Sequence, residues 1–219
     1  MRPADIGTAG FDDVIAEAQQ DHRWFPLQSQ MRVAGGNDYI DFVRQFLSDE
    51  PPADVPDFGN YDFRIFDHFP SMVRAIHERE EEAGLSRLVA GYAWEWVSKN
   101  DSSATDIEID GVALQWNQTP VDWINSRTSA QEVGSIHTVQ GYDLNYAGVI
   151  IGKDLQRDPA TGRLVVDRGN YFDRIGKRNN TMRGQVTTDD DLLEYIRNIY
   201  KVLMTRGMRG TYVYAPHLR

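Results

Sequence analysis

Apolar residues recur with helical spacing in two segments of the first fifty residues. Between residues 11 and 20, and again between residues 37 and 47, apolar side chains fall three or four positions apart. This spacing places them on one face of a helix, so both segments are predicted to be amphipathic helices. Asn37 stands at the start of the second segment, where its side chain is expected to cap the helix.

Two further helices carry clear start and stop signals. Pro70 suits the first turn of a helix and Gly84 the position just after its end, so a helix is predicted over residues 70–83. Near the end of the chain, Thr188 and Asp191 have the spacing of a capping box. A stripe of apolar residues at helical spacing follows them, which predicts a long final helix.

Short apolar runs between these helices predict buried strands. The runs of this kind are residues 87–93, 133–137, 147–152 and 211–215. Gly207 and Gly210 are expected to end the final helix ahead of the last of these strands. Helices that alternate with apolar strands indicate an α/β fold, with a mostly parallel sheet covered by helices on both faces. Ligands of such sheets usually bind at the carboxyl ends of the strands.

The remaining segments are predicted to be a loop and a hairpin. Residues 48–70 are acidic, proline-bearing and aromatic, which predicts an ordered surface loop with a short strand at residues 63–66. Residues 154–168 contain DPATG between two strand-like runs, which is the pattern of a β-hairpin.

The composition narrows the functional classes. The 219 residues carry a formal net charge of −10, whereas a free-standing nucleic-acid-binding protein is usually basic. Any binding of nucleic acid by this chain alone is therefore expected to be weak and to fall as salt rises. The absence of cysteine excludes thiolate metal sites and cysteine nucleophiles. No signal or membrane-spanning stretch is visible, so we expect a soluble, cytoplasmic protein with no membrane partner.

A polar turn between two predicted strands is the first candidate site. Residues 135–152 read SIHTVQGYDLNYAGVIIG and place polar side chains and a glycine directly after a strand. A glycine-containing turn there can bring backbone N–H groups close to phosphate oxygens. A structural turn with a core histidine explains the same residues, and spacing alone favours that interpretation.

Arg206 is the second candidate. It stands at the end of the last predicted helix, just before Gly207, where a rigidly held guanidinium can stabilise a transferring phosphoryl group. The helix dipole also favours a cation at that position, and without further information this structural explanation is preferred.

These two segments together resemble motifs V and VI of superfamily 1 helicases, in which a strand leads into a T-x-Q-G-type turn and a later helix ends in T-R. Residues 27–32, LQSQMR, resemble motif IV of the same enzymes. Residues 90–96 (AGYAWEW), 115–117 (QWN) and 198–214 extend the likeness. In this order the blocks resemble the bacterial Schlafen-type DNA/RNA helicase domain family over nearly the whole chain.

The resemblance implies a RecA-like lobe of the P-loop NTPase type, formed by residues 1–219 and equivalent to the C-terminal lobe of a helicase. It implies that Arg32 and Arg206 are catalytic and contact the γ-phosphate of ATP. It places Gln140 and Gly141 at the nucleotide cleft and Asp143 near the ribose. We expect both guanidinium groups to reach solvent on the same face as Gly141 and Asp143.

At His137 and Thr138 the resemblance implies contacts that couple this cleft to a nucleic-acid path. The chain lacks the G-x-x-x-x-G-K-[ST] loop that cradles phosphates. We therefore expect an upstream ATP-binding lobe to be missing from it, with ATP and Mg²⁺ bound only when that lobe is joined. The chain alone is expected to be inactive, and its expected partners are that lobe and single-stranded DNA or RNA.

Other nucleic-acid contacts are suggested by aromatic and basic residues. Trp94 and Trp96 fall on one face of an extended run and are candidates for base stacking, although packing against a helix explains them equally well. Lys177 and Arg178 belong to the most basic segment, residues 173–183, which is a candidate for tracking a phosphate backbone. A solvated loop explains that segment as well.

Three hypotheses of function follow. The first is the C-terminal half of an ATP-dependent helicase or translocase. The alternative is a catalytically inactive module of helicase-like fold that binds nucleic acid or protein. The third is a Mg²⁺-dependent nuclease that uses Asp106, Glu108 and Asp110 on one strand face, and we rank it last because no general base is evident nearby.

Overall fold

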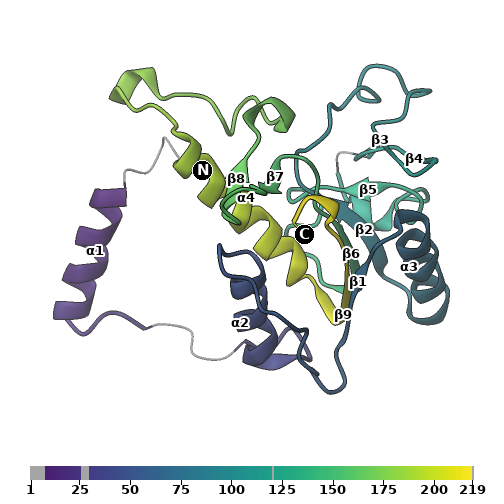
Figure 1. Cartoon of the computed structure of the whole chain (residues 1–219), viewed down its shortest axis with the longest axis horizontal. Coiled ribbons are helices and arrows are strands. Elements are labelled where there is room, and N and C mark those ends of the chain that lie inside the picture. Colours follow the sequence, from purple (N-terminus) through teal and green to yellow (C-terminus); the bar gives the residue numbers. More distant parts are fainter. Residues whose placement is uncertain (1–7, 26–29, 120, 219) are drawn as a thin grey trace.

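The computed structural model describes residues 8–25, 30–119 and 121–218. These ranges contain α-helices, a central sheet and two small hairpins (Figure 1). The α-helices are α1 (Thr8–Gln20), α2 (Gly36–Phe46), α3 (Phe69–Ala83) and α4 (Asp189–Met204). The strands of the central sheet are β1 (Asp62–Phe66), β2 (Ser86–Ala90), β5 (Val133–Gly134), β6 (Leu144–Ile150) and β9 (Gly207–Tyr214). Helix α1 stands apart from the sheet in Figure 1.

The central sheet is parallel throughout, in the order β1-β9-β6-β2-β5. Its last strand in the chain, β9, lies inside the sheet between β1 and β6. Parallel neighbours need a crossover connection, and helices supply two of them, because α3 joins β1 to β2 and α4 leads into β9. All amino ends of the strands consequently lie at one edge of the sheet and all carboxyl ends at the other.

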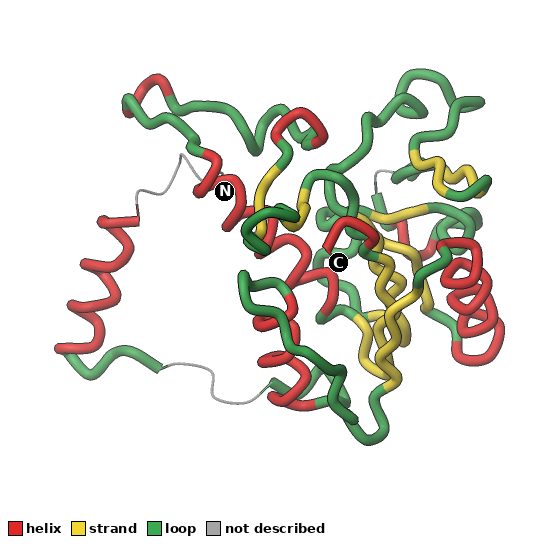
Figure 2. Tube along the Cα trace, in the orientation of Figure 1, coloured by secondary structure: helices red, strands yellow, loops and turns green. Residues whose placement is uncertain are grey.

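Helices cover both faces of this sheet (Figure 2). On one face α3 places Met72 and Ile76 in a buried cluster with residues of β2, β6 and β9. Gly148 of β6 allows this close approach, since a Cβ there would lie 2.7 Å from Cγ1 of Ile76. On the other face α2 and α4 bury Tyr39 and Ile196 in a second cluster. The predicted α/β fold, with a mostly parallel sheet and helices on both faces, is confirmed.

Two antiparallel hairpins extend from the body. One is formed by β3 (Ile107–Ile109) and β4 (Val112–Leu114), and the other by β7 (Leu155–Arg157) and β8 (Leu164–Val166). The second confirms the hairpin predicted over residues 154–168. No helix in the described ranges is long and apolar enough to cross a membrane.

Of the two predictions for the ends of the final helix, the one for its start is confirmed and the one for its end is wrong. Thr188 and Asp191 form the predicted capping box, with Oγ1 of Thr188 accepting from the Asp191 N–H at 3.1 Å. Gly207 and Gly210 were wrongly placed outside the sheet, because both lie in β9. They occupy a stretch where the pairing with β6 is irregular, and a Cβ on Gly210 would lie 2.8 Å from the ring of Tyr146.

In the first third of the chain one prediction needs correction and another is confirmed. Asn37 is not the cap of α2, whose N-cap is Gly35; it lies in the first turn and its Oδ1 accepts a bond from the Gln30 N–H at 3.4 Å. The short strand predicted at residues 63–66 within the acidic segment is confirmed, because residues 62–66 form edge strand β1, and α3 begins at residue 69. Tyr61 ties the loop to the sheet through a bond of 2.7 Å to Oγ1 of Thr211.

A fully buried carboxyl group lies between α4 and the β7–β8 hairpin. Oδ1 of Asp154 accepts from the hydroxyl of Tyr200 at 2.6 Å, whereas Oδ2 has no partner in the described part of the chain. Burial raises the pKa of Asp154 to about 7, and the bond from Tyr200 opposes this rise. The carboxyl group of Asp154 therefore binds its proton more tightly in the folded protein than in the unfolded chain.

This difference predicts a pH dependence of stability. The contribution of Asp154 to the free energy of unfolding should decline as pH rises from about 4, the value of a free aspartate, to about 7. Asp154→Asn cannot ionise, so its stability relative to the parent should be higher at pH 8 than at pH 5. Urea denaturation at both pH values measures the difference, and a difference that does not change with pH would contradict the prediction.

Candidate functional site

The pairing of β6 with β9 brings two predicted site residues together. The N–H of Leu144, which follows Asp143, donates to the carbonyl of Arg206 at 3.1 Å. The side chain of Arg206 lies against the residues just before β6, where its Nη1 donates to the carbonyl of Tyr142 at 3.4 Å. Arg206 is only 8% exposed, and its Nε has no hydrogen-bond partner among the described residues.

Arg32 reaches the same place from the N-terminal part of the chain. The N–H of Ala34 donates to the carbonyl of Met208 in β9 at 2.9 Å, which anchors this segment beside the sheet. From there Nε of Arg32 lies 2.7 Å from Oδ1 of Asp143, and the two side chains are 45% and 46% exposed. We call Arg32, Asp143 and Arg206 the arginine cluster.

The arginine cluster has more positive than negative charge. Burial lowers the pKa of Arg206, the charge of Arg32 lowers it further, and Asp143 acts in the opposite direction. An arginine nevertheless remains charged near neutral pH because its ordinary pKa is so high. Two guanidinium groups thus lie near one carboxylate, which pairs with Arg32, and the unpartnered Nε of Arg206 is a buried donor. This combination suits an additional anion.

The position of the cluster differs from the sequence-based expectation in two ways. Arg206 is largely buried, whereas an exposed side chain was expected, because the chain passes from α4 into β9 and residues 142–144 lie against it. It does lie on the side of Gly141 and Asp143. The cluster also lies at the amino ends of β6 and β9, whereas ligand sites in such sheets are usually at the carboxyl ends.

The turn that follows β5 is held by side-chain hydrogen bonds. The hydroxyl of Thr138 donates to Oδ1 of Asn117 at 2.9 Å and accepts from the Ser135 N–H at 2.8 Å. Oδ1 of Asn117 also accepts from the Ser135 N–H at 2.9 Å. Thr138 therefore has a structural position inside the turn, whereas His137 and Gln140 are exposed on its surface.

Asn117 holds this turn from outside it, although from the sequence it was named only as part of the QWN block and was given no role. It is buried and adopts φ of +48°, a left-handed conformation that asparagine tolerates better than most residues. The sequence feature that could have pointed to this role is the asparagine of QWN, but its hydrogen-bond partners lie 18 and 21 positions away. Spacing could not reveal that connection. Gly141, with φ of +87°, meets the expectation of a glycine-dependent turn.

The two candidate tryptophans do not form one stacking face. Trp94 lines a pocket together with residues at the carboxyl edge of the sheet. Trp96 lines a different hollow, where its ring packs 6.5 Å from that of Trp116 and the Nζ of Lys99 lies 5.1 Å above it. The structure thus separates the tryptophans, contrary to the expectation from their spacing.

In the basic segment, Lys177 is hydrogen-bonded to its own loop and Arg178 is exposed. Nζ of Lys177 donates to the carbonyls of Tyr171 and Arg168 at 2.6 and 3.2 Å, so this lysine braces its own loop. Arg178 is exposed. Of the two, only Arg178 is free to contact a phosphate without breaking these bonds.

The carboxylates proposed for a nuclease do not converge. Asp106 accepts from the N–H groups of Ser98 and Trp116 at 2.8 and 2.7 Å and from the Ser98 hydroxyl. Asp110 accepts from the Tyr214 hydroxyl at 3.5 Å, and Glu108 is exposed. The described residues contain no group of three acidic or histidine side chains arranged to hold a metal ion. The structure therefore gives no support to the nuclease hypothesis.

Comparison with known proteins identifies the family. The family described as Schlafen group 3, DNA/RNA helicase domain, matches residues 3–217. The chain belongs to this family. The resemblance noted in the sequence is thereby confirmed, and the lobe is a helicase-like module.

Relatives of this helicase-domain chain add little about function. It is 33% identical over 218 residues to the uncharacterized protein YPL245W of Saccharomyces cerevisiae, a match that covers 90% of this chain and 47% of that protein. The chain thus spans about half the length of this relative. A solved structure titled as the C-terminal domain of a possible DNA helicase from Lactobacillus plantarum shares 10% identity, covering 81% of this chain and 83% of that one. Its TM-score of 0.34 is too low to carry an inference.

The turn after β5 yields a test of the role of Asn117. Asn117→Gly keeps the left-handed backbone accessible but removes the acceptor of two bonds, so the protein should lose about 1–3 kcal/mol of unfolding free energy. Asn100→Gly, at an exposed position, is the matched control and should cost about 1 kcal/mol or less. Urea denaturation of both variants measures the two losses; equal losses would show that the bonds of Asn117 contribute nothing.

Proposed function

We propose that this helicase-like chain is the second lobe of an ATP-driven motor. In that role it supplies Arg32 and Arg206 to the phosphates of a nucleotide that a separate lobe binds. The observation that supports the proposal is the arginine cluster, in which residues 174 positions apart converge with a single carboxylate and a buried, unpartnered donor. Its members match the positions that helicases of the resembled family use.

Arg206 is suited to stabilising a transition state. In phosphoryl transfer, negative charge develops on the equatorial oxygens of the transferred group, and a donor fixed in advance costs no reorganisation when the reaction occurs. The end of α4 and the start of β9 hold Arg206, and Leu203 and Met204 just before it are fully buried. Its guanidinium is therefore positioned by core packing.

Arg32 and Asp143 supply the movable part of the site. Their ion pair is half exposed, and exposed pairs of this kind are worth only about 0–1 kcal/mol. An incoming phosphate, with its higher charge, therefore competes well for Arg32. Release from Arg32 leaves the Asp143 carboxylate able to accept bonds from ribose hydroxyls, as the family resemblance implies.

Cofactor and partners follow from the same reasoning. ATP and Mg²⁺ are bound by the lobe that carries a phosphate-binding loop, and single-stranded DNA or RNA is the track. His137, exposed on the turn that follows β5, and Arg178 are the candidates of this chain for contacting nucleic acid. The net charge of −10 makes such contacts weak in the isolated chain.

One observation favours the alternative of an inactive binding module. Arg206 is largely buried and Arg32 is already paired, so both arginines have partners that stabilise the fold. A lobe whose arginines only hold the turn of residues 137–143 in place needs no nucleotide. The two functions differ in whether the arginines matter for hydrolysis once the partner lobe is present.

The isolated chain should not hydrolyse ATP. It has no loop to cradle the β- and γ-phosphates, so even with the arginine cluster in place no phosphate is held in line for attack. A phosphate-release assay under multiple-turnover conditions measures this. Sustained turnover that disappears in a variant of one of the chain's own residues would overturn the proposed division of labour.

In a protein that joins this chain to an ATP-binding lobe, Arg206→Ala should lower the turnover number by about 10³ or more. Arg206→Lys should recover little of it, because an ammonium group lacks the planar fork of the guanidinium. Arg163→Ala, on the exposed β7–β8 turn, is the matched control and should leave turnover unchanged.

The measurement combines steady-state ATP hydrolysis with nucleotide affinity and thermal unfolding. A loss of turnover with unchanged melting temperature supports the motor. If Arg206→Ala lowers only the melting temperature and hydrolysis per folded molecule is unchanged, the arginine is structural and the binding module is the better description.

A further inference from the structure

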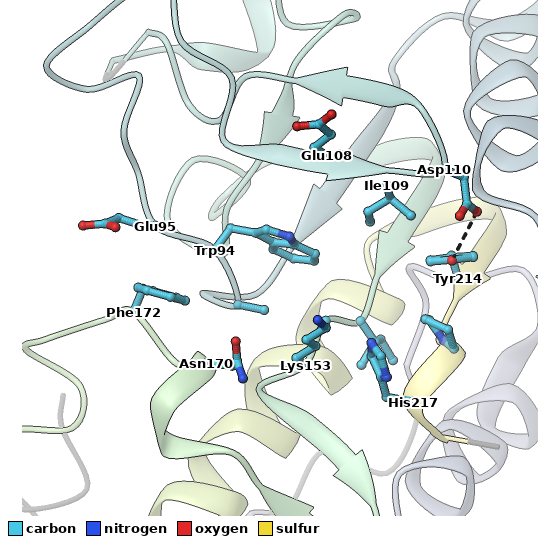
Figure 3. A pocket seen from close by; sticks show the side chains of 14 residues that line it. Trp94, Glu95, Glu108, Ile109, Asp110, Lys153, Asn170, Phe172, Tyr214 and His217 are labelled. Atoms are coloured by element: carbon cyan, nitrogen blue, oxygen red, sulfur yellow. Dashed lines mark hydrogen bonds between the residues drawn. The ribbon is translucent and has the colours of Figure 1, made fainter.

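The pocket that Trp94 lines lies at the opposite edge of the sheet from the arginine cluster. It encloses about 510 Å³ where the chain leaves the carboxyl ends of β2, β6 and β9 (Figure 3). The N–H of Ile151 donates to the carbonyl of Tyr214 at 2.9 Å, which continues the β6–β9 pairing to the floor of this pocket. The carboxyl edge is where doubly wound parallel sheets generally bind their ligands.

Two aromatic rings flank the pocket. Trp94 is half-buried and lies over Gly152, where a Cβ would come within 2.7 Å of its ring, so only glycine permits this placement. Phe172 approaches from the other side, because its N–H donates to the carbonyl of Tyr92 at 2.7 Å. Its ring is 37% exposed. Open aromatic faces of this kind are suited to stacking against a flat ring.

The polar groups of the pocket include a cation and an acceptor. Lys153 is exposed, forms no ion pair within the described ranges, and directs its Nζ into the space below Trp94 (Figure 3). His217 lies beside it, and burial together with the charge of Lys153 lowers the pKa of His217. Nδ2 of Asn170 donates to Asp167 at 2.6 Å, which leaves its Oδ1 toward the rings.

Three carboxylates border the pocket, and they lie away from the space that Lys153 faces. Glu95 and Glu108 point away from the space between Trp94 and Lys153 (Figure 3). Asp110 lies at the far side and accepts from the hydroxyl of Tyr214. Lys153 thus presents its charged group to the space beside the rings, while the carboxylates of Glu95, Glu108 and Asp110 lie at the border of the pocket. The occupant is therefore expected to be a flat ring that carries an anion.

We propose that this pocket binds a nucleoside phosphate, with the base against Trp94 and Phe172 and the phosphate on Lys153. Oδ1 of Asn170 accepts a bond from an amino group of the base. The chemistry is shared by a free nucleotide and by one nucleotide unit of a single strand. The site lies at the opposite sheet edge from Arg32 and Arg206, so it does not depend on the motor function proposed above.

The test is isothermal titration of the purified chain with adenosine 5′-monophosphate, adenosine, ribose 5-phosphate and a short single-stranded oligoadenylate. The monophosphate should bind more tightly than adenosine, which lacks the anion, and ribose 5-phosphate should not bind, because it lacks the ring. Trp94→Ala and Lys153→Ala should each weaken binding by roughly tenfold or more. Trp24→Ala and Arg163→Ala, at exposed positions away from the pocket, are the matched controls and should change nothing.

Each outcome decides the proposal. Binding of the monophosphate that is lost in the two pocket variants supports it and identifies a free nucleotide as a ligand. Binding of the oligonucleotide alone, with the same sensitivity, supports it and identifies a strand. Absence of binding by both, or binding that survives in the pocket variants, overturns it. Binding lost in Arg206→Ala but kept in Trp94→Ala also overturns it, since the ligand would then lie at the arginine cluster.

Discussion

The backbone pairing of β6 with β9 is the constraint on which both sites depend. At its amino end the Leu144–Arg206 bond sets Asp143 beside Arg206, and at its carboxyl end the Ile151–Tyr214 bond sets Lys153 near His217. The seven residues of β6 separate these ends by about 23 Å. Because β9 lies inside the sheet, with β1 paired to it from Gly210 to Tyr214, the carboxyl end cannot shift without breaking a second row of hydrogen bonds.

The two edges of the sheet carry different chemistry. The amino edge presents two guanidinium groups, of which one is buried and the other forms a half-exposed ion pair with a carboxylate. These groups suit the phosphate oxygens of the proposed nucleotide. The carboxyl edge presents aromatic rings near one lysine, and these groups suit the base and the phosphate of the proposed ligand.

The elements that the sequence predicted well are those specified by neighbouring residues. The capping box at Thr188, the glycine stop at Gly84 and the β7–β8 hairpin each depend on side chains within a few positions. Features set by distant contacts were missed. The burial of Arg206 depends on residues about sixty positions earlier, and Asn117 acts on a turn about twenty positions away. The roles of Arg32 and Arg206 came from family resemblance, because no local pattern distinguishes a catalytic arginine from a helix-ending one.

The central claim is that Arg32 and Arg206 form a phosphate site that is completed by another lobe. A crystal structure of this chain joined to an ATP-binding lobe, with Mg²⁺, ADP and a planar fluoride mimic of the transferred phosphoryl group, tests it most directly. The account predicts that Arg32 leaves Asp143 and that both guanidinium groups lie within hydrogen-bond distance of the mimic. The account is contradicted if the mimic is bound while Arg32 remains on Asp143 and Arg206 remains on the carbonyl of Tyr142.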